Sequence, residues 1–264
     1  MTARIIATCN QKGGVGKTNT TFHLARAAVN AGRRTLLIDA DPQGNLSDVA
    51  VPELERDQPS LADVLTERSS DGIADVAVPG AWDGLTVVPS VGSGLVSVRD
   101  ELIIAGPGRE SRLRDALALV AEDYDLVLID CAPSLDQLTV NALTAADGVA
   151  VVTEASLFST NGLAQLMRTV TTVREHYNRA LRVAGIIVNR YDSRERGVRA
   201  AMDDLTAGAA AHQLEILEPH VPKRAAIRDA MEAGAGLDQD RRAEVRELAD
   251  LYAAHLRTLE GAIQ

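Results

Sequence analysis

Aromatic residues are scarce in this sequence, in which phenylalanine, tryptophan and tyrosine make up 3% of 264 residues. A core for a chain of this length must therefore be built mainly from leucine, valine, isoleucine and alanine. Short continuous runs of such residues are typical of a parallel sheet that helices cover on both faces. The low aromatic content thus favours an α/β fold.

Long apolar runs are also missing, and the first run, "RIIATC" (4–9), already ends at Asn10. A helix that crosses a bilayer needs roughly 20 apolar residues, so we expect neither a membrane span nor an export signal. Cysteine is equally scarce, and Cys9 and Cys131 lack the spacing of metal ligands. We therefore expect reduced thiols in a cytoplasmic protein.

Lysine occurs only at Lys12, Lys17 and Lys223, and every other basic residue is an arginine, which we interpret as coding bias. The acidic residues outnumber the basic ones, and the formal net charge is −10. A field of this sign repels nucleic acid and anionic lipid at long range. Contact with either partner would require a local basic patch.

Short apolar runs alternate with longer segments of helical periodicity. The runs predict strands at 4–9, 34–40, 85–90, 124–134, 147–155 and 182–190, and the periodic segments predict helices at about 17–31, 60–67, 110–122, 137–145, 160–177, 196–211 and 241–260. This alternation predicts one doubly wound α/β domain over residues 1–264, with a mostly parallel sheet and helices on both faces. The stretch of roughly 43–108 is rich in proline, glycine and serine, and we expect mobile, irregular loops there.

A glycine-rich turn joins the first predicted strand to the first predicted helix. In "NQKGGVGKTNTT" (10–21), Gly-Lys-Thr follows a strand and opens a helix, and in this setting such a turn binds phosphate. Glycines let backbone N–H groups converge on the phosphates, and the helix N-terminus adds partial positive charge. We predict that Lys17 reaches the β- and γ-phosphates and that the Thr18 hydroxyl completes a Mg²⁺ shell. The predicted phosphate-binding residues are Gly13, Gly14, Val15, Gly16, Lys17 and Thr18, and a glycine-rich turn without a ligand is the alternative.

The same turn carries a second lysine, Lys12, although Lys17 alone suffices to hold a phosphate. A side chain five residues before Lys17 lies on the outer side of the turn. It can therefore extend away from its own nucleotide toward a neighbouring molecule. The alternative is a solvated lysine at the mouth of the turn.

Two predicted strands end in carboxylates. Asp39 lies at the tip of one strand with Asp41 two residues later, and Asp130 ends the apolar run of another. In open α/β sheets the carboxyl ends of the strands line the ligand crevice. We predict that Asp130 holds Mg²⁺, directly or through water, and that Asp41 orients the attacking water and approaches the metal through water. For Asp39 we favour the capping of a turn.

These segments together resemble a known family. The loop x-K-G-G-x-G-K-T, "DADPQGN" (39–45) and "IDCAPS" (129–134) resemble the motifs of the ParA/MinD family of deviant Walker A ATPases, which partition or position cargo. The resemblance implies a P-loop NTPase fold, ATP and Mg²⁺ as ligands, and weak ATP hydrolysis. In that family the extra lysine crosses a two-fold interface to the partner's nucleotide, so Lys12 is implied to bind nucleotide and to act in catalysis within a homodimer. Asp41 matches the catalytic acid, and Asp130 matches the acid linked to Mg²⁺.

The resemblance also assigns segments around these motifs. Residues 42–44 and 132–134 match the two switch loops, although Ala132 stands where proline is usual. Asn19 replaces a common threonine and is implied to contact the α-phosphate. Later in the chain, "GIIVNRYDSR" and "EPHVPKRAAIRDAMEAG" resemble the segments that close over adenine, which places Asn189 and Pro222 against the base.

Members of this family bind either DNA, as ParA does, or a membrane through a C-terminal amphipathic helix, as MinD does. The segment 241–264 mixes acidic and basic residues opposite its apolar stripe, so we interpret it as a core-packed helix. Two clusters of mixed sign, 189–199 and 221–229, carry a small basic excess. The resemblance places Arg194 and Lys223 at DNA-contacting positions, and we add the adjacent Arg224. A solvated arginine face is the alternative.

The leading hypothesis is therefore a cytoplasmic, nucleoid-associated partitioning ATPase. An ATP-sandwich homodimer would bind DNA non-specifically, and a ParB-like or other adaptor would stimulate hydrolysis and release, moving a plasmid, a chromosome or other cargo. We expect no helix-turn-helix extension before the first strand. A MinD-like ATPase at the membrane surface is the alternative. A metabolic or electron-transfer ATPase is disfavoured, because Cys9 and Cys131 lie beside the nucleotide loops and not at a dimer axis.

Overall fold

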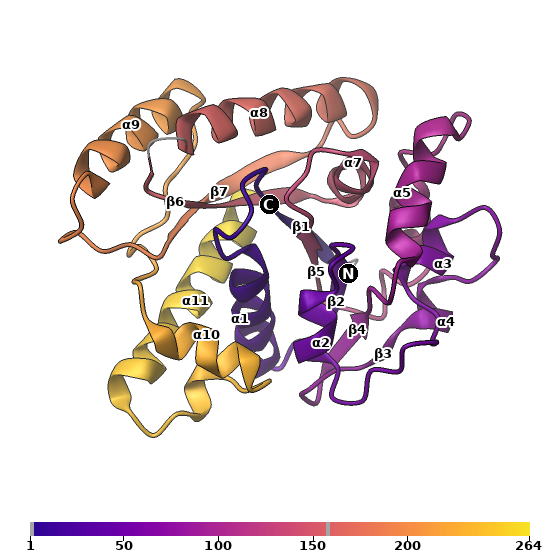
Figure 1. Cartoon of the computed structure of the whole chain (residues 1–264), viewed down its shortest axis with the longest axis horizontal. Helices are drawn as coiled ribbons and strands as arrows, with labels where there is room; N and C mark the ends of the chain where they lie inside the picture. Colours follow the sequence, from indigo (N-terminus) through magenta and orange to yellow (C-terminus); the bar gives the residue numbers. More distant parts are fainter. Residues whose placement is uncertain (1–2, 157–158) are drawn as a thin grey trace.

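The computed structural model describes residues 3–156 and 159–264, and within them the strands form a seven-stranded sheet in the order β3-β4-β2-β5-β1-β6-β7. Neighbouring strands are parallel, except that the short β3 pairs antiparallel with β4 (Figure 1). The strands are β1 (Arg4–Cys9), β2 (Thr35–Ala40), β3 (Val78–Pro79), β4 (Leu85–Val88), β5 (Leu126–Cys131), β6 (Gly148–Glu154) and β7 (Arg182–Asn189).

Helices cover both faces of this sheet (Figure 1). Apolar side chains of one sheet face pack with α3 (Leu61–Leu65), α4 (Ile73–Val76), α5 (Gly94–Ile104), α6 (Arg112–Ala118), α7 (Gln137–Ala145), α8 (Ser159–His176) and α9 (Val198–Ala211). Those of the other face pack with α1 (Lys17–Asn30), α2 (Asn45–Ala50), α10 (Ala225–Glu232), the 3₁₀ turn η1 (Leu237–Gln239) and α11 (Ala243–Ala262). The predicted doubly wound α/β fold is confirmed.

The central strands β2 and β5 show why the fold forms from this sequence. Every residue of both strands is buried. Along β2, Leu36 and Ile38 belong to one core and Leu37 to the other. Successive side chains of a strand point to opposite faces, so a continuous apolar run is stable only where both faces are covered. The sheet therefore has two cores, and its strand ends remain as the edge on which a ligand site can form.

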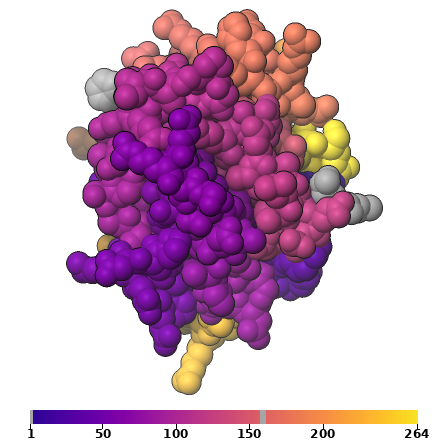
Figure 2. All heavy atoms as spheres, turned by 90° about the vertical axis from the view of Figure 1, so that its right-hand side faces the viewer, coloured from indigo at the N-terminus to yellow at the C-terminus, as the bar shows by residue number. Residues whose placement is uncertain are grey.

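The stretch 43–108 is more regular than the sequence predicts. It contains α2, α3, α4 and α5 and the strands β3 and β4, and its purple to magenta atoms make up much of the face in Figure 2. On α5, the buried residues Leu95, Val98 and Leu102 recur at helical spacing. Burial of this stripe in the core shared with α3 and α7 stabilises a helix that begins at a glycine and contains β-branched residues. Helices and strands cover fewer than half of the residues in this stretch, so it keeps many loops, but it adds α2, α4, α5 and β3 to the predicted elements at 60–67 and 85–90.

The C-terminal helix α11 is part of the core. Val245, Leu248, Tyr252, Leu256 and Leu259 are all buried in the core that also contains α1. The interpretation of this segment as a core-packed helix is confirmed. Among the described helices, none is both long and apolar enough to cross a membrane.

Candidate functional site

Three neighbouring strands bring the predicted site residues to one edge of the sheet. Asp130 of β5 is in register with Thr8 of β1 on one side and with Asp39 of β2 on the other. The loops that follow these three strands carry the phosphate loop (10–16), the first switch (42–44) and the second switch (132–134). Parallel strands all end at the same edge, so motifs more than a hundred residues apart in sequence meet there.

The backbone of the phosphate loop has a shape that requires glycine. Gly14 and Gly16 have φ angles of +78° and +87°, in the left-handed region. A Cβ at Gly16 would collide with the amide nitrogen of Asn189. That amide donates hydrogen bonds to the carbonyl oxygens of Val15 (3.0 Å) and Gly16 (3.4 Å). The end of β7 thus holds the loop in place just before α1 begins at Lys17.

Lys17 lies in a setting that suits a bound anion. Its residue is 6% exposed, and the described part of the chain supplies no hydrogen bond or ion pair to its amine. A buried ammonium group is costly without a counter-charge. Lys17 and the N-terminus of α1 therefore form a donor set that fits a phosphate group.

Asp130 is the buried carboxylate at the centre of this edge. The hydroxyls of Thr8 and Thr21 donate to its Oδ1 at 3.3 and 3.2 Å. Burial raises the pKa of Asp130 to about 6, and a hydrogen bond from the Thr18 hydroxyl opposes that rise. Burial disfavours the ionised form of this carboxyl group, and a cation bound beside it would stabilise that form.

Thr18 and Asp130 are thus brought together as predicted, and their oxygens are the ligands that Mg²⁺ prefers. The described residues contain no cluster of three or more His, Cys, Asp or Glu side chains that would hold a metal by themselves. Mg²⁺ commonly binds through one or two protein oxygens together with substrate phosphates and water. The residues present therefore fit a magnesium–nucleotide complex and not a metal cage made of protein alone.

Asp39 caps a turn, as the sequence predicts. Its carboxylate accepts hydrogen bonds from the backbone N–H of Asp41 (3.1 Å) and from the N–H and hydroxyl of Ser47 (2.9 and 2.7 Å). Burial raises the pKa of Asp39 to about 7, and the charge of Asp130 adds to that rise. Asp39 therefore holds the first switch and α2 in place, and we assign it a structural role.

Asp41 is only partly buried, at the start of the first switch. Its Oδ1 accepts a hydrogen bond from the N–H of Gln43 at 3.0 Å. Its charge also raises the pKa of Asp130, which indicates that the two carboxylates are close in space. Asp41 is thus placed beside the predicted metal position, with its charge accessible to water.

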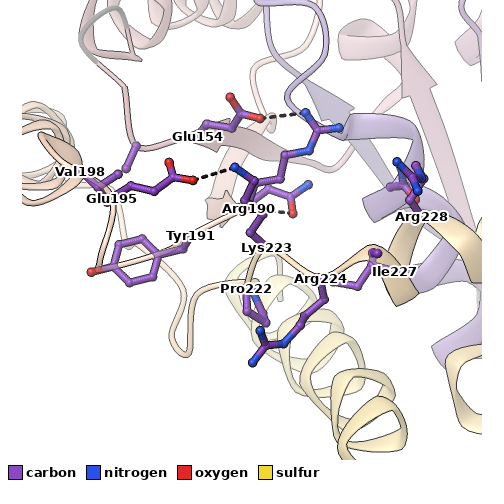
Figure 3. Close-up of a pocket in the computed structure, with 14 residues that line it drawn as sticks. Glu154, Arg190, Tyr191, Glu195, Val198, Pro222, Lys223, Arg224, Ile227 and Arg228 are labelled. Atoms are coloured by element: carbon purple, nitrogen blue, oxygen red, sulfur yellow. Dashed lines mark hydrogen bonds and ion pairs between the residues drawn. The ribbon is translucent and has the colours of Figure 1, made fainter.

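Lys12 is in a different environment from Lys17. Its side chain is 42% exposed, and its Nζ lies 3.7 Å from Glu154 Oε2 and 3.2 Å from Ser156 Oγ. Glu154 also pairs with Arg190 at 3.1 Å (Figure 3), and Arg190 donates to the carbonyl oxygen of Gly14 at 2.6 Å. Glu154 therefore connects Lys12 to Arg190 at the mouth of the phosphate loop. The sequence did not predict a role for Glu154 or Arg190 at the phosphate loop, although Glu154 is the last residue of β6 and Asp130 is the last but one of β5.

A cleft of ≈ 560 Å³ opens beside the phosphate loop. Its lining includes Asn19, Glu154, Asn189, Arg190, Tyr191, Glu195, Pro222, Lys223 and Arg224, several of which are labelled in Figure 3. Both residues predicted to contact the base are thus at this cleft. Asn189, however, is 3% exposed and uses its side chain within the chain, donating to the phosphate loop and accepting from the N–H of Arg190. Of these two residues, Pro222 is therefore the better candidate for direct contact with a base.

The predicted DNA-binding residues are exposed, but two of them are paired with acids. Arg194 forms a two-bond pair with Asp192 at 2.9 and 2.8 Å. Lys223 lies 2.6 Å from Glu195 (Figure 3). Both pairs are at the surface, where an ion pair contributes little and is easily exchanged for another anion. Arg224 has no acidic partner within the described residues.

A strand, a glycine-rich turn with a buried lysine, and acids at two adjacent strand ends define a P-loop NTPase. A model of the AAA domain family matches residues 3–183. The chromosome partitioning protein ParA of Caulobacter vibrioides is 44% identical over 194 residues, which are 72% of this chain and 71% of that protein. The chain belongs to the ParA/MinD family of deviant Walker A ATPases.

Two further comparisons bear on length and on ligands. An uncharacterized protein of Mycobacterium tuberculosis is 44% identical over 201 residues, and this match spans 76% of the chain but only 62% of that relative. Cobyrinic acid a,c-diamide synthase from Mycobacterium smegmatis, crystallised with ADP and magnesium, has a TM-score of 0.77 at 33% identity. That match covers 97% of this chain and 96% of the synthase.

Proposed function

We propose that this protein is an ATP-dependent partitioning switch. Mg·ATP closes a homodimer, the dimer holds DNA without sequence preference, and a partner protein stimulates hydrolysis and release. One observation carries the proposal: the two lysines of the phosphate loop lie in different environments. Lys17 is buried beside the phosphate position, whereas Lys12 is exposed at the loop mouth and available to a second molecule.

The ligand in this proposal is ATP with Mg²⁺, in line with the ADP and magnesium of the M. smegmatis neighbour. Lys17 and the backbone N–H groups of the phosphate loop would hold the phosphates, and Thr18 and Asp130 would hold the cation. Mg²⁺ supplies neutralisation of the charge that develops on the phosphates. The buried amine of Lys17, whose charge acts on Asp130, and the pKa of Asp130, which burial raises, both support this assignment.

Hydrolysis requires a water molecule in line with the bond to be broken. Phosphoryl transfer depends mostly on positioning and charge neutralisation. We assign the positioning of that water to Asp41, whose partly buried carboxylate lies near Asp130. Lys12 of the second copy would add positive charge opposite Lys17, so hydrolysis would remove the ligand that joins the two copies.

The DNA contact is assigned to the exposed basic residues beside the cleft. Arg194, Lys223 and Arg224 of one copy carry too little charge for firm phosphate binding, because affinity rises with the number of phosphates neutralised. Two copies would present twice that number on one surface. The buried apolar face of α11 supports DNA over a membrane as the partner surface. The 44% identity to ParA of C. vibrioides over 194 residues supports partitioning.

A DNA retention assay tests this function. The protein is mixed with a DNA fragment of arbitrary sequence and with ATP, ADP or no nucleotide, across a salt series, and liposome flotation is run in parallel. We expect retention with ATP alone, falling steeply with salt. Retention that ignores the nucleotide, or flotation without retention, would overturn the proposal.

A further inference from the structure

The two cysteines of the chain lie side by side in the sheet. Cys9 is the last residue of β1 and Cys131 the last of β5, and these strands are neighbours. Their sulfur atoms are 3.1 Å apart, and neither cysteine forms a disulfide. Both side chains belong to the core on the sheet face that α7 covers, opposite to the face on which Thr8 and Asp130 meet α1. The pair is thus a pre-aligned dithiol.

The position of the pair connects it to the nucleotide site. The phosphate loop starts at the residue after Cys9, and the second switch starts at the residue after Cys131. The two loops lie close together, because a Cβ added to Gly13 would lie 3.7 Å from Pro133 Cβ. A bond between the two sulfurs would therefore join the bases of both loops.

We propose that Cys9 and Cys131 form a redox-sensitive site at which a small peroxide makes a disulfide that halts ATP turnover. One cysteine sulfur attacks the peroxide and gains an oxygen as a sulfenic acid, while its thiol proton joins the departing hydroxide to give the first water. The second thiol then attacks that sulfur, forming the S–S bond and releasing the second water. Two thiols lose two protons and two electrons, and hydrogen peroxide is reduced to two waters.

The loss of turnover follows from geometry and rests on the proposed function. A disulfide needs a sulfur separation of about 2.05 Å, so the two sulfurs, which are 3.1 Å apart in the dithiol, must move about 1 Å closer. Asp130 and Asn10 are the chain neighbours of the two cysteines and would move with them. A displacement of roughly 1 Å at a catalytic group can cost on the order of a hundredfold in rate.

Burial sets the chemical class of the oxidant. Each cysteine is 1% exposed, so only a small molecule that enters during local opening of the loops can reach a sulfur. Hydrogen peroxide meets this requirement, whereas oxidised glutathione is bulky and must approach along the S–S axis. The site is therefore selective for peroxide.

The test treats the reduced full-length protein with hydrogen peroxide or with oxidised glutathione. Free thiols are then counted in denaturant, and peptides are mapped without reductant. We expect peroxide to remove both thiols together, to link the Cys9 and Cys131 peptides and to be reversed by dithiothreitol, while glutathione leaves both thiols. Peroxide that leaves both thiols, or that gives sulfinic acids without the linked peptide, would overturn the proposal.

ATP turnover of the same samples tests the regulatory half. The oxidised wild type should lose most of its turnover and regain it with dithiothreitol, whereas Cys131→Ala and Cys9→Ala should show no reversible loss. If either variant fails to fold, the oxidised and re-reduced wild type remains its own control. A linked peptide with unchanged turnover would overturn the regulation. If the reduced protein shows no ATP turnover, the proposed function is overturned instead. The thiol count would then still show whether the disulfide forms.

Discussion

Two lysines of a single loop differ in what surrounds them. Lys17 is 6% exposed and unpaired within the described residues, whereas the Lys12 side chain is 42% exposed and lies near Glu154 and Ser156. A buried ammonium group is suited to a fixed anion in its own site. An exposed one, such as Lys12 with its surface ion pair to Glu154, can exchange that pair for another anion. At the residue scale, Glu154 thus competes with any second molecule for Lys12.

Glu154→Gln tests this competition. Removing the carboxylate leaves Lys12 with its contact to Ser156 and without this ion pair. The homodimer contains two such lysines and an exposed ion pair is worth about 0.2–1 kcal/mol, so ATP-dependent dimerisation should occur at a protein concentration lower by roughly two- to thirty-fold. The midpoint is measured by sedimentation with a non-hydrolysable ATP analogue. Glu195→Gln, which removes a different acid from the same cleft, is the matched control and should leave the midpoint unchanged. A higher midpoint in Glu154→Gln would show that Glu154 assists the dimer.

Short-range hydrogen bonds at the end of β2 hold a whole segment of the chain. Asp39 accepts from the Ser47 hydroxyl, and that hydroxyl in turn accepts from the N–H of Ser90 at 2.8 Å. Asp39 lies in β2, Ser47 in α2 and Ser90 just after β4. At the element scale, one buried carboxylate therefore connects the first switch to two strands.

This carboxylate should make stability depend on pH. The pKa of Asp39 is raised from 3.8 to about 7 by burial, so between these values the folded state keeps a proton that the unfolded state has lost. Stability from this group is therefore present at low pH and lost as pH rises toward 7. Each pKa unit is worth about 1.4 kcal/mol. We expect Asp39→Asn, which cannot ionise, to flatten the fall in Tm between pH 4 and pH 7.

Thermal unfolding of the ligand-free protein and of the variant, recorded across this pH range, checks the prediction. The slope is compared and not the absolute Tm, because the amide also loses a hydrogen bond that the carboxylate accepts. Parallel curves for the two proteins would show that Asp39 ionises normally.

Elements could be predicted from the sequence where the periodicity was strong. The predicted strands and the helix 137–145 match the structure within a few residues. The short elements α2, α4 and β3 were not predicted, and neither were α5 and α10. Helix α5 begins with glycine and contains valine and serine, and α10 lies within the segment 218–234 that the family resemblance assigns to adenine closure. In α10, Ile227 and Met231 are buried four residues apart, a short apolar stripe whose partner surface lies on distant elements.

The candidate site was predictable where a motif lies on one local segment. Lys17, Thr18 and Asp130 follow from strand-end and glycine-turn patterns, and the structure brings them together. The partners of those residues were not predictable. Thr8 and Thr21 on Asp130, or Glu154 beside Lys12, are contacts between segments far apart in sequence. Such contacts depend on strand order and side-chain direction, which no local pattern contains.

The whole molecule has a net charge of −10, which opposes DNA at long range. Its exposed basic residues Arg194 and Lys223 are each held by an acid of the same chain. We predict that the double variant Arg194→Ala with Lys223→Ala reduces the salt dependence of ATP-driven DNA binding. The slope of log K against log salt should fall by up to about 2 for each copy.

A control variant distinguishes the effect of Arg194 and Lys223 from the effect of the net charge of the protein. Arg99→Ala with Arg114→Ala also removes two exposed arginines that pair with acids, here Asp100 and Asp115, on α5 and α6. Both double variants lose the same total charge. The control variant should leave the salt slope unchanged, because its two arginines do not lie on the proposed DNA surface. Equal slopes for the two double variants would place the DNA surface elsewhere.

The central claim concerns two copies of the chain joined by nucleotide, and the most direct measurement is the molecular mass in solution. Wild type and Lys12→Ala are each saturated with Mg²⁺ and a non-hydrolysable ATP analogue, and binding of the analogue is verified by equilibrium dialysis. We expect the wild type to be a dimer and Lys12→Ala to be a monomer that still binds the analogue. A monomeric wild type, or a Lys12→Ala variant that dimerises equally well, would contradict the account.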